Sequence, residues 1–159
     1  MSWQLRTATE ADLDAIMAIE TRVFPDDAWS AATMRAELRD GNGVYLVASP
    51  LDDPSRVDAY GGVRAPRRQP QADIQTIAVV EDARRHGLGR VLMLRMLDIA
   101  RERGAEELFL EVRADNPGAQ ALYLSLGFEQ IAVRPRYYKG AVDALIMRLA
   151  ITDPKAALA

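Results

Sequence analysis

The alternation of apolar and polar residues along the chain predicts a mixed α/β fold. Helices are expected where apolar residues recur every three or four positions, and strands where they alternate or form short runs between turn residues. The predicted helices cover residues 13–23, 30–40, 88–103 and 117–126. The predicted strands cover residues 2–8, 44–49, 57–65, 72–80, 106–113, 128–134 and 142–150.

The order of these elements places a strand–helix–strand crossover in the middle of the chain. Thr9 and Asp12 form a capping-box pattern before the first helix, and Ser30 is placed to cap the second. No repeat, low-complexity tract or linker interrupts the 159 residues, a length typical of one domain. We therefore predict a single domain over residues 1–150 and a C-terminal tail over residues 151–159.

Composition narrows the possible functions. The sequence has no cysteine and a single histidine, His86, which argues against disulfides, thiolate nucleophiles and cysteine- or histidine-rich metal sites, so no metal is expected. The formal net charge of −3 favours neither nucleic acid nor an anionic membrane as a partner. The first residues lack the apolar core of a signal peptide, and no apolar run approaches the ~20 residues that span a bilayer. We expect a soluble cytoplasmic protein.

The sharpest local signal is the segment Arg84 to Arg90, which reads Arg-Arg-His-Gly-Leu-Gly-Arg. Gly87 and Gly89 allow backbone N–H groups to approach an anion at a helix start, where the helix dipole favours negative charge. Together with three arginines, this chemistry suits a pyrophosphate. The segment lacks the lysine of a P-loop and the third glycine of a dinucleotide fingerprint. The alternative is a solvated, arginine-rich helix start, with His86 as a surface residue.

Several motifs resemble those of one enzyme family. Residues 84–89 match the Q/R-x-x-G-x-G/A signature of the GNAT superfamily of N-acetyltransferases. Residues 110–113 (LEVR), Asn116, residues 121–123 (ALY) and residues 126–128 (LGF) extend the match to the RimI type, and the resemblance covers nearly the whole chain. It implies the GNAT fold: a central, mostly antiparallel sheet of about seven strands with a splayed parallel pair, flanked by about four helices.

The resemblance also implies acetyl-CoA as the co-substrate. In this superfamily the glycine-containing turn binds the pyrophosphate of coenzyme A through backbone amides. The preceding strand pairs with the pantetheine arm and presents the thioester carbonyl to a backbone N–H, and an asparagine contacts coenzyme A. The residues at these positions here are Ile77, Ala78, Val79, Arg84, Arg85, His86, Gly87, Leu88, Gly89, Arg90 and Asn116. Taken alone, Asn116 also reads as a simple turn residue before a proline.

Glu111 and Tyr123 are the candidate catalytic residues. Glu111 lies beside Phe109 on a predicted central strand, where partial burial favours a raised pKa and a role as a base. The alternative is a structural ion pair with Arg113 or another arginine. Tyr123 lies on an apolar helical stripe, which by itself is typical of a core residue. The resemblance implies that Glu111 is the general base and Tyr123 the general acid.

The pKa of the acceptor amine mildly favours a protein N-terminus. An α-amino group with a pKa of about 7.7–8 is roughly 15% neutral at pH 7, whereas a lysine amine is only about 0.04% neutral. The resemblance implies acetylation of the N-terminal alanine of a small-subunit ribosomal protein. Candidate acceptor-binding residues are Asp27, Trp29, Tyr137 and Tyr138, for which solvated or packing roles are equally compatible with the sequence.

Two departures from the RimI pattern lie near the expected acceptor side. Ala28 stands where a proline commonly precedes Trp-Ser, and Thr76 stands where an asparagine commonly precedes Ile-Ala-Val. Alternative functions are therefore a GNAT enzyme for lysine side chains or small-molecule amines, and a non-catalytic acyl-CoA-binding module. The presence of both Glu111 and Tyr123 argues against the non-catalytic module.

Overall fold

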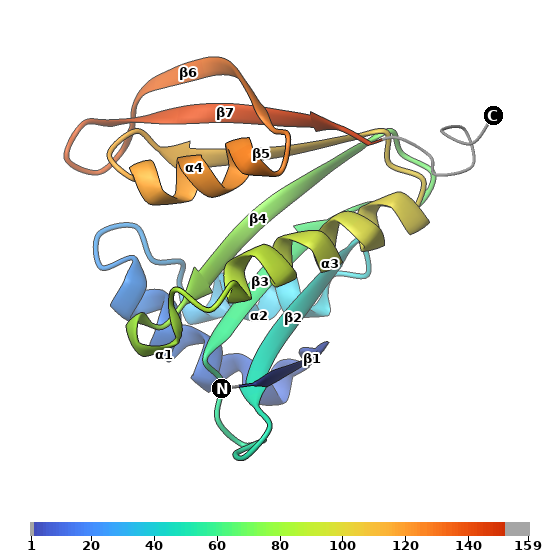
Figure 1. Cartoon of the computed structure of the whole chain (residues 1–159), viewed down its shortest axis with the longest axis vertical. Coiled ribbons are helices and arrows are strands. Elements are labelled where there is room, and N and C mark those ends of the chain that lie inside the picture. Colours follow the sequence, from blue (N-terminus) through green and yellow to red (C-terminus); the bar gives the residue numbers. More distant parts are fainter. Residues whose placement is uncertain (1, 152–159) are drawn as a thin grey trace.

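A seven-stranded sheet runs through the computed structural model, which describes residues 2–151 (Figure 1). The strand order is β1-β2-β3-β4-β5-β7-β6, and β4 and β5 form a parallel pair in an otherwise antiparallel sheet. The strands are β1 (Trp3–Thr7), β2 (Gly43–Pro50), β3 (Ala59–Arg64), β4 (Gln71–Val79), β5 (Glu107–Arg113), β6 (Glu129–Tyr138) and β7 (Val142–Ala150). The α-helices are α1 (Leu13–Val23), α2 (Ala31–Arg39), α3 (Leu88–Glu102) and α4 (Pro117–Ser125).

The predicted element order and fold class are confirmed. The capping box is also present: Thr9 N–H donates to Asp12 Oδ2 at 2.9 Å, at the start of the 3₁₀ turn that leads into α1. The strand predicted over residues 128–134 extends to Tyr138, because β6 resumes its pairing with β7 there. The predicted tail lies outside the described residues except for Ile151, and the single-domain division stays a prediction.

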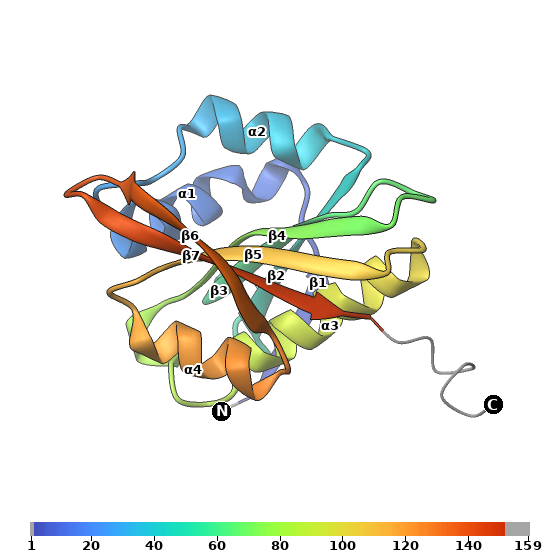
Figure 2. The same cartoon turned by 90° about the horizontal axis from the view of Figure 1, so that it is seen from above.

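Helices cover both faces of the sheet. Figure 2 shows α1 and α2 on one face and α3 and α4 on the other. One core cluster packs α3 against the sheet and includes Leu92 and Met96; the other packs α1 and α2 and includes Ile16 and Met34. Burial of these two apolar layers is the main stabilising contribution expected for such a fold. Within residues 2–151, none of the helices has the length and apolar character needed to cross a membrane.

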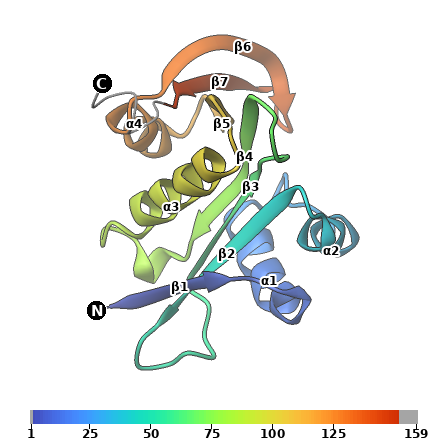
Figure 3. The same cartoon turned by 90° about the vertical axis from the view of Figure 1, so that its right-hand side faces the viewer.

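The parallel strands β4 and β5 separate along their length. They pair only over residues 71–73 and 107–109, and the two ribbons then diverge (Figures 1 and 3). On the other side of β4, Val63 lies opposite Ile74 and Gly62 opposite Thr76, so Gln75 is an extra residue that forms a bulge. Because a bulge bends its strand, it accompanies the departure of β4 from β5. The sheet therefore opens into a cleft at its centre.

Candidate active site

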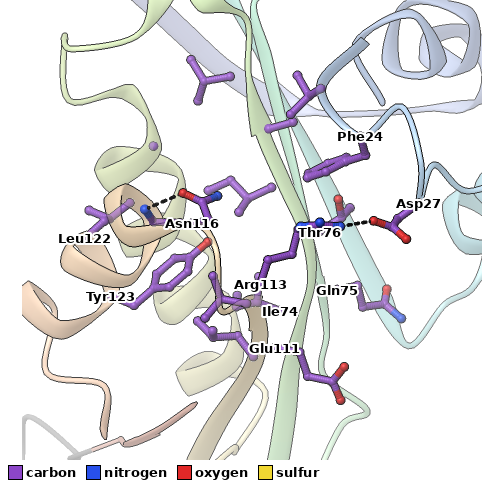
Figure 4. Close-up of a pocket in the computed structure, with 18 of the residues that line it drawn as sticks. Phe24, Asp27, Ile74, Gln75, Thr76, Glu111, Arg113, Asn116, Leu122 and Tyr123 are labelled. Atoms are coloured by element: carbon purple, nitrogen blue, oxygen red, sulfur yellow. Dashed lines mark hydrogen bonds and ion pairs between the residues drawn. The ribbon is translucent and has the colours of Figure 1, made fainter. Parts of the chain in front are cut away.

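The cleft between β4 and β5 has a volume of about 2060 Å³. An ordinary site for one drug-sized ligand measures about 300–1,000 Å³, so this cleft has room for two substrates. One end is lined by the start of α3 and by α4, and the other by the loop 24–29 and the β6–β7 turn. Figure 4 shows side chains from these elements converging on the cleft.

The start of α3 is an anion-binding site in geometry and charge. The N-cap is Gly87, whose φ of 78° is in the left-handed region, and no side chain caps the helix. By contrast, Ser30 caps α2 and Asn116 caps α4 with their side chains. The first N–H groups of α3 thus remain available to a ligand, and the helix dipole adds partial positive charge. Gly87, Leu88 and Gly89 all line the cleft. That this turn binds a pyrophosphate stays a prediction.

The basic residues of this turn have different roles. Arg84 Nε donates to the carbonyl oxygen of Val79 at 3.0 Å, and Arg90 Nη1 donates to Ser125 Oγ at 3.0 Å, so both also tie neighbouring elements together. Arg85 is exposed and lines the cleft. The His86 ring instead packs against Trp3, with centroids 5.3 Å apart, and does not line the cleft. The structure therefore gives the His86 side chain the surface role that the sequence left open.

The cleft-facing edge of β4 presents free backbone groups. Val80 N–H donates to Asp58 O at 2.9 Å on the β3 side. Since backbone groups alternate in direction along a strand, the N–H groups of Ile77 and Val79 point to the opposite edge, where β5 has diverged. The Ala78 side chain is buried against α1 and α2, and its backbone groups point to the β3 side, where Ala78 lies opposite Tyr60, so Ala78 offers no backbone donor at the free edge. That this edge binds the donor stays a prediction.

Glu111 lies on the face of β5 opposite to the α3–α4 core. Leu110 and Val112 are buried in that core, and the alternation of side chains along the strand places Glu111 on the other side. Its side chain is 32% exposed and pairs with Arg134 on β6, with an Oε1–Nη1 distance of 3.3 Å. The structural ion pair that the sequence analysis gave as the alternative role of Glu111 is therefore present, and its partner is Arg134. Arg113 instead pairs with Asp27 and Asp115. An exposed pair of this kind is readily exchanged for a substrate contact.

Tyr123 combines a core position with access to the cleft. The residue is only 7% exposed and its ring makes an edge-to-face contact with Phe128, at a centroid distance of 6.0 Å. The side chain also lines the cleft, across β5 from Glu111 (Figure 4). Burial raises the pKa of the Tyr123 hydroxyl to about 12, so this group stays protonated throughout the neutral range. A protonated hydroxyl facing a cleft is suited to donate a proton.

Replacement of Tyr123 by phenylalanine is expected to lower kcat for acetyl transfer by about ten- to a hundredfold, because the proton donor is lost. In the unchanged enzyme, the raised pKa predicts that ionisation of Tyr123 does not reduce kcat between about pH 8 and pH 10. Steady-state kinetics across this range test both expectations. A tyrosine that only packs in the core would leave kcat of the phenylalanine variant unchanged.

Asn116 has a structural role and one free group. Its side-chain Oδ1 accepts a hydrogen bond from Ala119 N–H at 3.2 Å and so caps α4. Within the described residues its Nδ2 makes no hydrogen bond to another residue. The residue lines the cleft next to Tyr123 (Figure 4), so the amide nitrogen is placed to contact a ligand.

At the acceptor end, the carboxylate of Asp27 is already in an ion pair. Its Oδ2 accepts a hydrogen bond from Arg113 Nη1 (Figure 4). Its Oδ1 accepts one from Lys139 N–H at 3.2 Å. Asp27 thereby ties the loop between α1 and α2 to β5 and to the β6–β7 turn. This arrangement supports the structural interpretation of Asp27, and leaves less free charge for a cationic substrate.

Tyr137 and Tyr138 form an aromatic wall at this end of the cleft, and their contact with an acceptor stays a prediction. Tyr137 and Tyr138 contact each other edge to face, with centroids 5.1 Å apart, and both line the cleft. The guanidinium groups of Arg134 and Arg113 lie 5.0 and 5.1 Å from the Tyr137 and Tyr138 ring centroids, respectively. Burial, followed by the charge of nearby Glu111, raises the pKa of Tyr138 to about 12. Trp29 lines the loop side.

The site residues named from the sequence did not include Glu20 or Gln75, and Thr76 was noted only as a departure from the family pattern. Glu20, Gln75 and Thr76 all line the cleft, and Glu20 is almost fully buried at 2% exposure. One signal was available: Glu20 follows Ile16 by four positions, so a charged residue stands on the apolar face of α1. No local pattern marks Gln75, because a bulge depends on the partner strand. Among residues 2–151, no group of three acidic or histidine side chains is arranged to hold a metal.

The comparisons with known proteins agree with this geometry. The chain belongs to the acetyltransferase (GNAT) family, whose model matches residues 13–128. It is 34% identical over 150 residues to the N-alpha-acetyltransferase RimI of Mycobacterium tuberculosis, covering 92% of this chain and 91% of that protein. It is 38% identical over 146 residues to a protein of Mycobacterium leprae, covering 89% of this chain but only 39% of that longer protein.

A solved structure extends the agreement to the fold. The crystal structure of the ribosomal-protein-S18-alanine N-acetyltransferase from Escherichia coli superposes with a TM-score of 0.84 at 31% sequence identity, covering 96% of each chain. The predicted family and the predicted GNAT fold are therefore confirmed. The class of enzyme is that of the family, an acetyltransferase.

Proposed function

We propose that this chain transfers an acetyl group from acetyl-CoA to the α-amino group of a protein N-terminus. The observation that carries the proposal is the cleft at which β4 and β5 part, with an uncapped helix start at one end and an aromatic wall at the other. The acceptor we propose is the N-terminal alanine of ribosomal protein S18, which the name of the Escherichia coli relative specifies. A cytoplasmic location, where such an acceptor is synthesised, is part of the proposal.

The residues at the α3 end fit the donor. The free N–H groups of Leu88, Gly89 and Arg90 suit the pyrophosphate, with Arg85 adding positive charge. The free edge of β4 suits the amide-containing arm, and Asn116 Nδ2 provides one further donor. When bound, acetyl-CoA supplies an acetyl group activated as a thioester. No covalent enzyme intermediate is required.

The remaining residues account for the transfer. Glu111 accepts a proton from the acceptor amine, directly or through a water molecule, as its nitrogen forms the new bond to the acetyl carbon. The N–H of Val79 donates to the acetyl oxygen as negative charge develops there. The carbon–sulfur bond then breaks, and Tyr123 donates its proton to the departing sulfur. The base and the acid lie on opposite sides of β5, so the proton is taken up and delivered at separate points (Figure 4).

A peptide that offers both amines tests the acceptor. The substrate is an octapeptide with a free N-terminal alanine and an internal lysine, incubated with acetyl-CoA and mapped by tandem mass spectrometry. Acetylation is expected on the α-amine, with the lysine unmodified; the same peptide blocked at its N-terminus serves as the control. Acetylation of lysine alone, or no transfer although acetyl-CoA binds, would contradict the proposal.

A further inference from the structure

A buried carboxylate without a cationic partner lies at the acceptor end of the cleft. Glu20 on α1 is 2% exposed, and its side chain contributes to the cleft lining. Tyr60 O–H donates to its Oε1, and the backbone N–H of Trp29 donates to its Oε2 at 2.9 Å. Within the described residues, no lysine, arginine or histidine forms an ion pair with it. The buried carboxylates Asp12 and Asp58, in contrast, are paired with Arg6 and Arg56.

Such a charge is costly to keep. A buried carboxylate is destabilising unless a cation or several hydrogen-bond donors compensate it. Glu20 has two donors, Tyr60 O–H and Trp29 N–H, while an ionised carboxylate has about four acceptor sites. The site thus retains capacity for a positively charged ligand.

Hydroxyl groups connect Glu20 to the open part of the cleft. Tyr60 is fully buried on β3, and its Oη lies 3.5 Å from Thr76 Oγ1 on β4. Thr76 lines the cleft, next to the bulge at Gln75. A ligand at Thr76 therefore meets a chain of polar groups that ends on the Glu20 carboxylate. Thr76 is also where the sequence departs from the asparagine typical of its relatives' motif.

A second carboxylate adds to the negative potential behind β4. Glu37 on α2 has a buried Oε2 without a hydrogen-bond partner. Burial is the main cause of the raised pKa of Tyr45, and the charges of Glu37 and Glu20 raise it further, which places both carboxylates near this phenol. Tyr45 O–H in turn donates to Gln75 Oε1 at 3.2 Å, and Gln75 lines the cleft.

The neighbouring arginines do not neutralise this region. Arg113 pairs with Asp27 and Asp115, and Arg134 pairs with Glu111. The acceptor end therefore combines negative charge from α1 and α2 with two arginines that are already paired. A cationic ligand is the complementary one, and a protonated α-amino group at neutral pH has that charge.

We propose that Glu20 is a positioning residue that holds the protonated α-amino group of the acceptor at the Thr76 side of the cleft, acting through Tyr60 and Thr76. This inference rests on the proposed function and adds a recognition site for the ammonium group to it. Glu20 retains the ammonium form at the site. One proton is then released to solvent to give the neutral amine, and Glu111 accepts the second proton as the nitrogen forms its bond to the acetyl carbon. The site thereby favours a free α-amine over an N-terminus that carries no charge.

A purely structural role makes a different prediction. Glu20 also fixes the loop 24–29 through Trp29 N–H. In the variant Glu20→Gln, the amide oxygen still accepts from Trp29, and the shape of the side chain is preserved while its charge is lost. If Glu20 only supports the loop, this variant leaves discrimination between charged and uncharged N-termini unchanged.

The experiment is a binding cycle that does not depend on turnover. Calorimetry measures the affinity of the CoA-saturated enzyme for an octapeptide beginning with alanine, and for the same peptide with a propionyl group in place of the alanyl residue, which removes only the amine. The unchanged enzyme is expected to bind the free-amine peptide at least about tenfold more tightly. In Glu20→Gln this ratio is expected to fall to about threefold or less, with the affinity for CoA unchanged.

Two further variants make the result specific. Thr76→Val preserves shape, removes the hydroxyl that links the cleft to Tyr60, and is expected to reduce the ratio as well. Asp12→Asn removes a buried carboxylate outside the cleft and is expected to keep the ratio of the unchanged enzyme. Equal ratios in Glu20→Gln and the unchanged enzyme would overturn the inference. If the ratio of the two peptide affinities depends on Glu20 but the α-amine is not acetylated, the inference about Glu20 stands and the proposed function is refuted instead.

Discussion

Replacement of Glu111 by glutamine is expected to lower kcat by about 10²- to 10⁴-fold, the usual contribution of a general base. Glutamine has nearly the same shape and still reaches the cleft, but it does not accept a proton from the acceptor amine. Because Glu111 lies on β5, away from the α3 start, the KM for acetyl-CoA is expected to change little. The pair with Arg134 is exposed, so its loss is expected to cost less than about 1 kcal/mol of stability.

The same strand offers a matched control. Glu107 lies on the same face of β5 as Glu111 and pairs with Arg148 at 3.0 Å, yet it does not line the cleft. Glu107→Gln therefore changes charge and ion pairing without touching the site, and its kcat is expected to be normal. Initial-rate kinetics at saturating acetyl-CoA measure kcat for both variants and for the unchanged enzyme. A normal rate in Glu111→Gln would remove Glu111 from the mechanism and return it to the structural role in the pair with Arg134.

Gly89→Glu is expected to weaken acetyl-CoA binding by at least about 100-fold. A Cβ on Gly89 would lie 3.6 Å from Leu122 and 3.9 Å from Val79, which are ordinary contact distances, so the backbone is not forced to move. The added carboxylate instead extends into the turn that is proposed to hold the pyrophosphate. Repulsion between two anions in a partly enclosed site accounts for the lost affinity.

A companion variant separates charge from bulk. Gly89→Ala adds only the Cβ, for which there is space, and is expected to bind acetyl-CoA with nearly normal affinity. Calorimetric titration of both variants, with a melting curve for each, measures the difference. Unchanged affinity in the glutamate variant would place the pyrophosphate elsewhere. A loss of affinity in both variants would show that steric contact, rather than charge, limits this turn.

Local patterns in the sequence were sufficient to predict the helices and strands and to place the glycine-containing turn at the start of α3. The period of apolar residues identified each helix and strand, because an amphipathic element must bury one face. The start of α3 was recognisable because Gly87 adopts a positive φ, and a glycine at that position is a local requirement. The end of β6 was not predicted, because residues 135–138 are mostly exposed and carry no apolar alternation.

The acceptor end depended on contacts between distant parts of the chain. Asp27 and Arg113 are 86 positions apart, and their pairing changes Asp27 from a candidate substrate ligand into a structural tie. His86 was grouped with the phosphate turn by its neighbours in sequence, whereas its ring packs against Trp3 in the folded chain. Neither outcome follows from spacing, since ion pairs and ring contacts form between residues that only the sheet brings together.

The sequence by itself thus determined the order of elements and the family motifs, because these depend on local periodicity and short segments. The resemblance to the family then implied Glu111 and Tyr123 as the candidate catalytic residues, and their roles stay predictions. Only the tertiary structure showed that β4 and β5 separate after residues 73 and 109, and that Glu20 lies buried at the acceptor end without a cation. Strand separation and burial depend on which distant segments pack together. For this reason the sequence was sufficient to predict a glycine-containing turn at the start of α3, whereas the contacts at the opposite end of the cleft became apparent only from the fold.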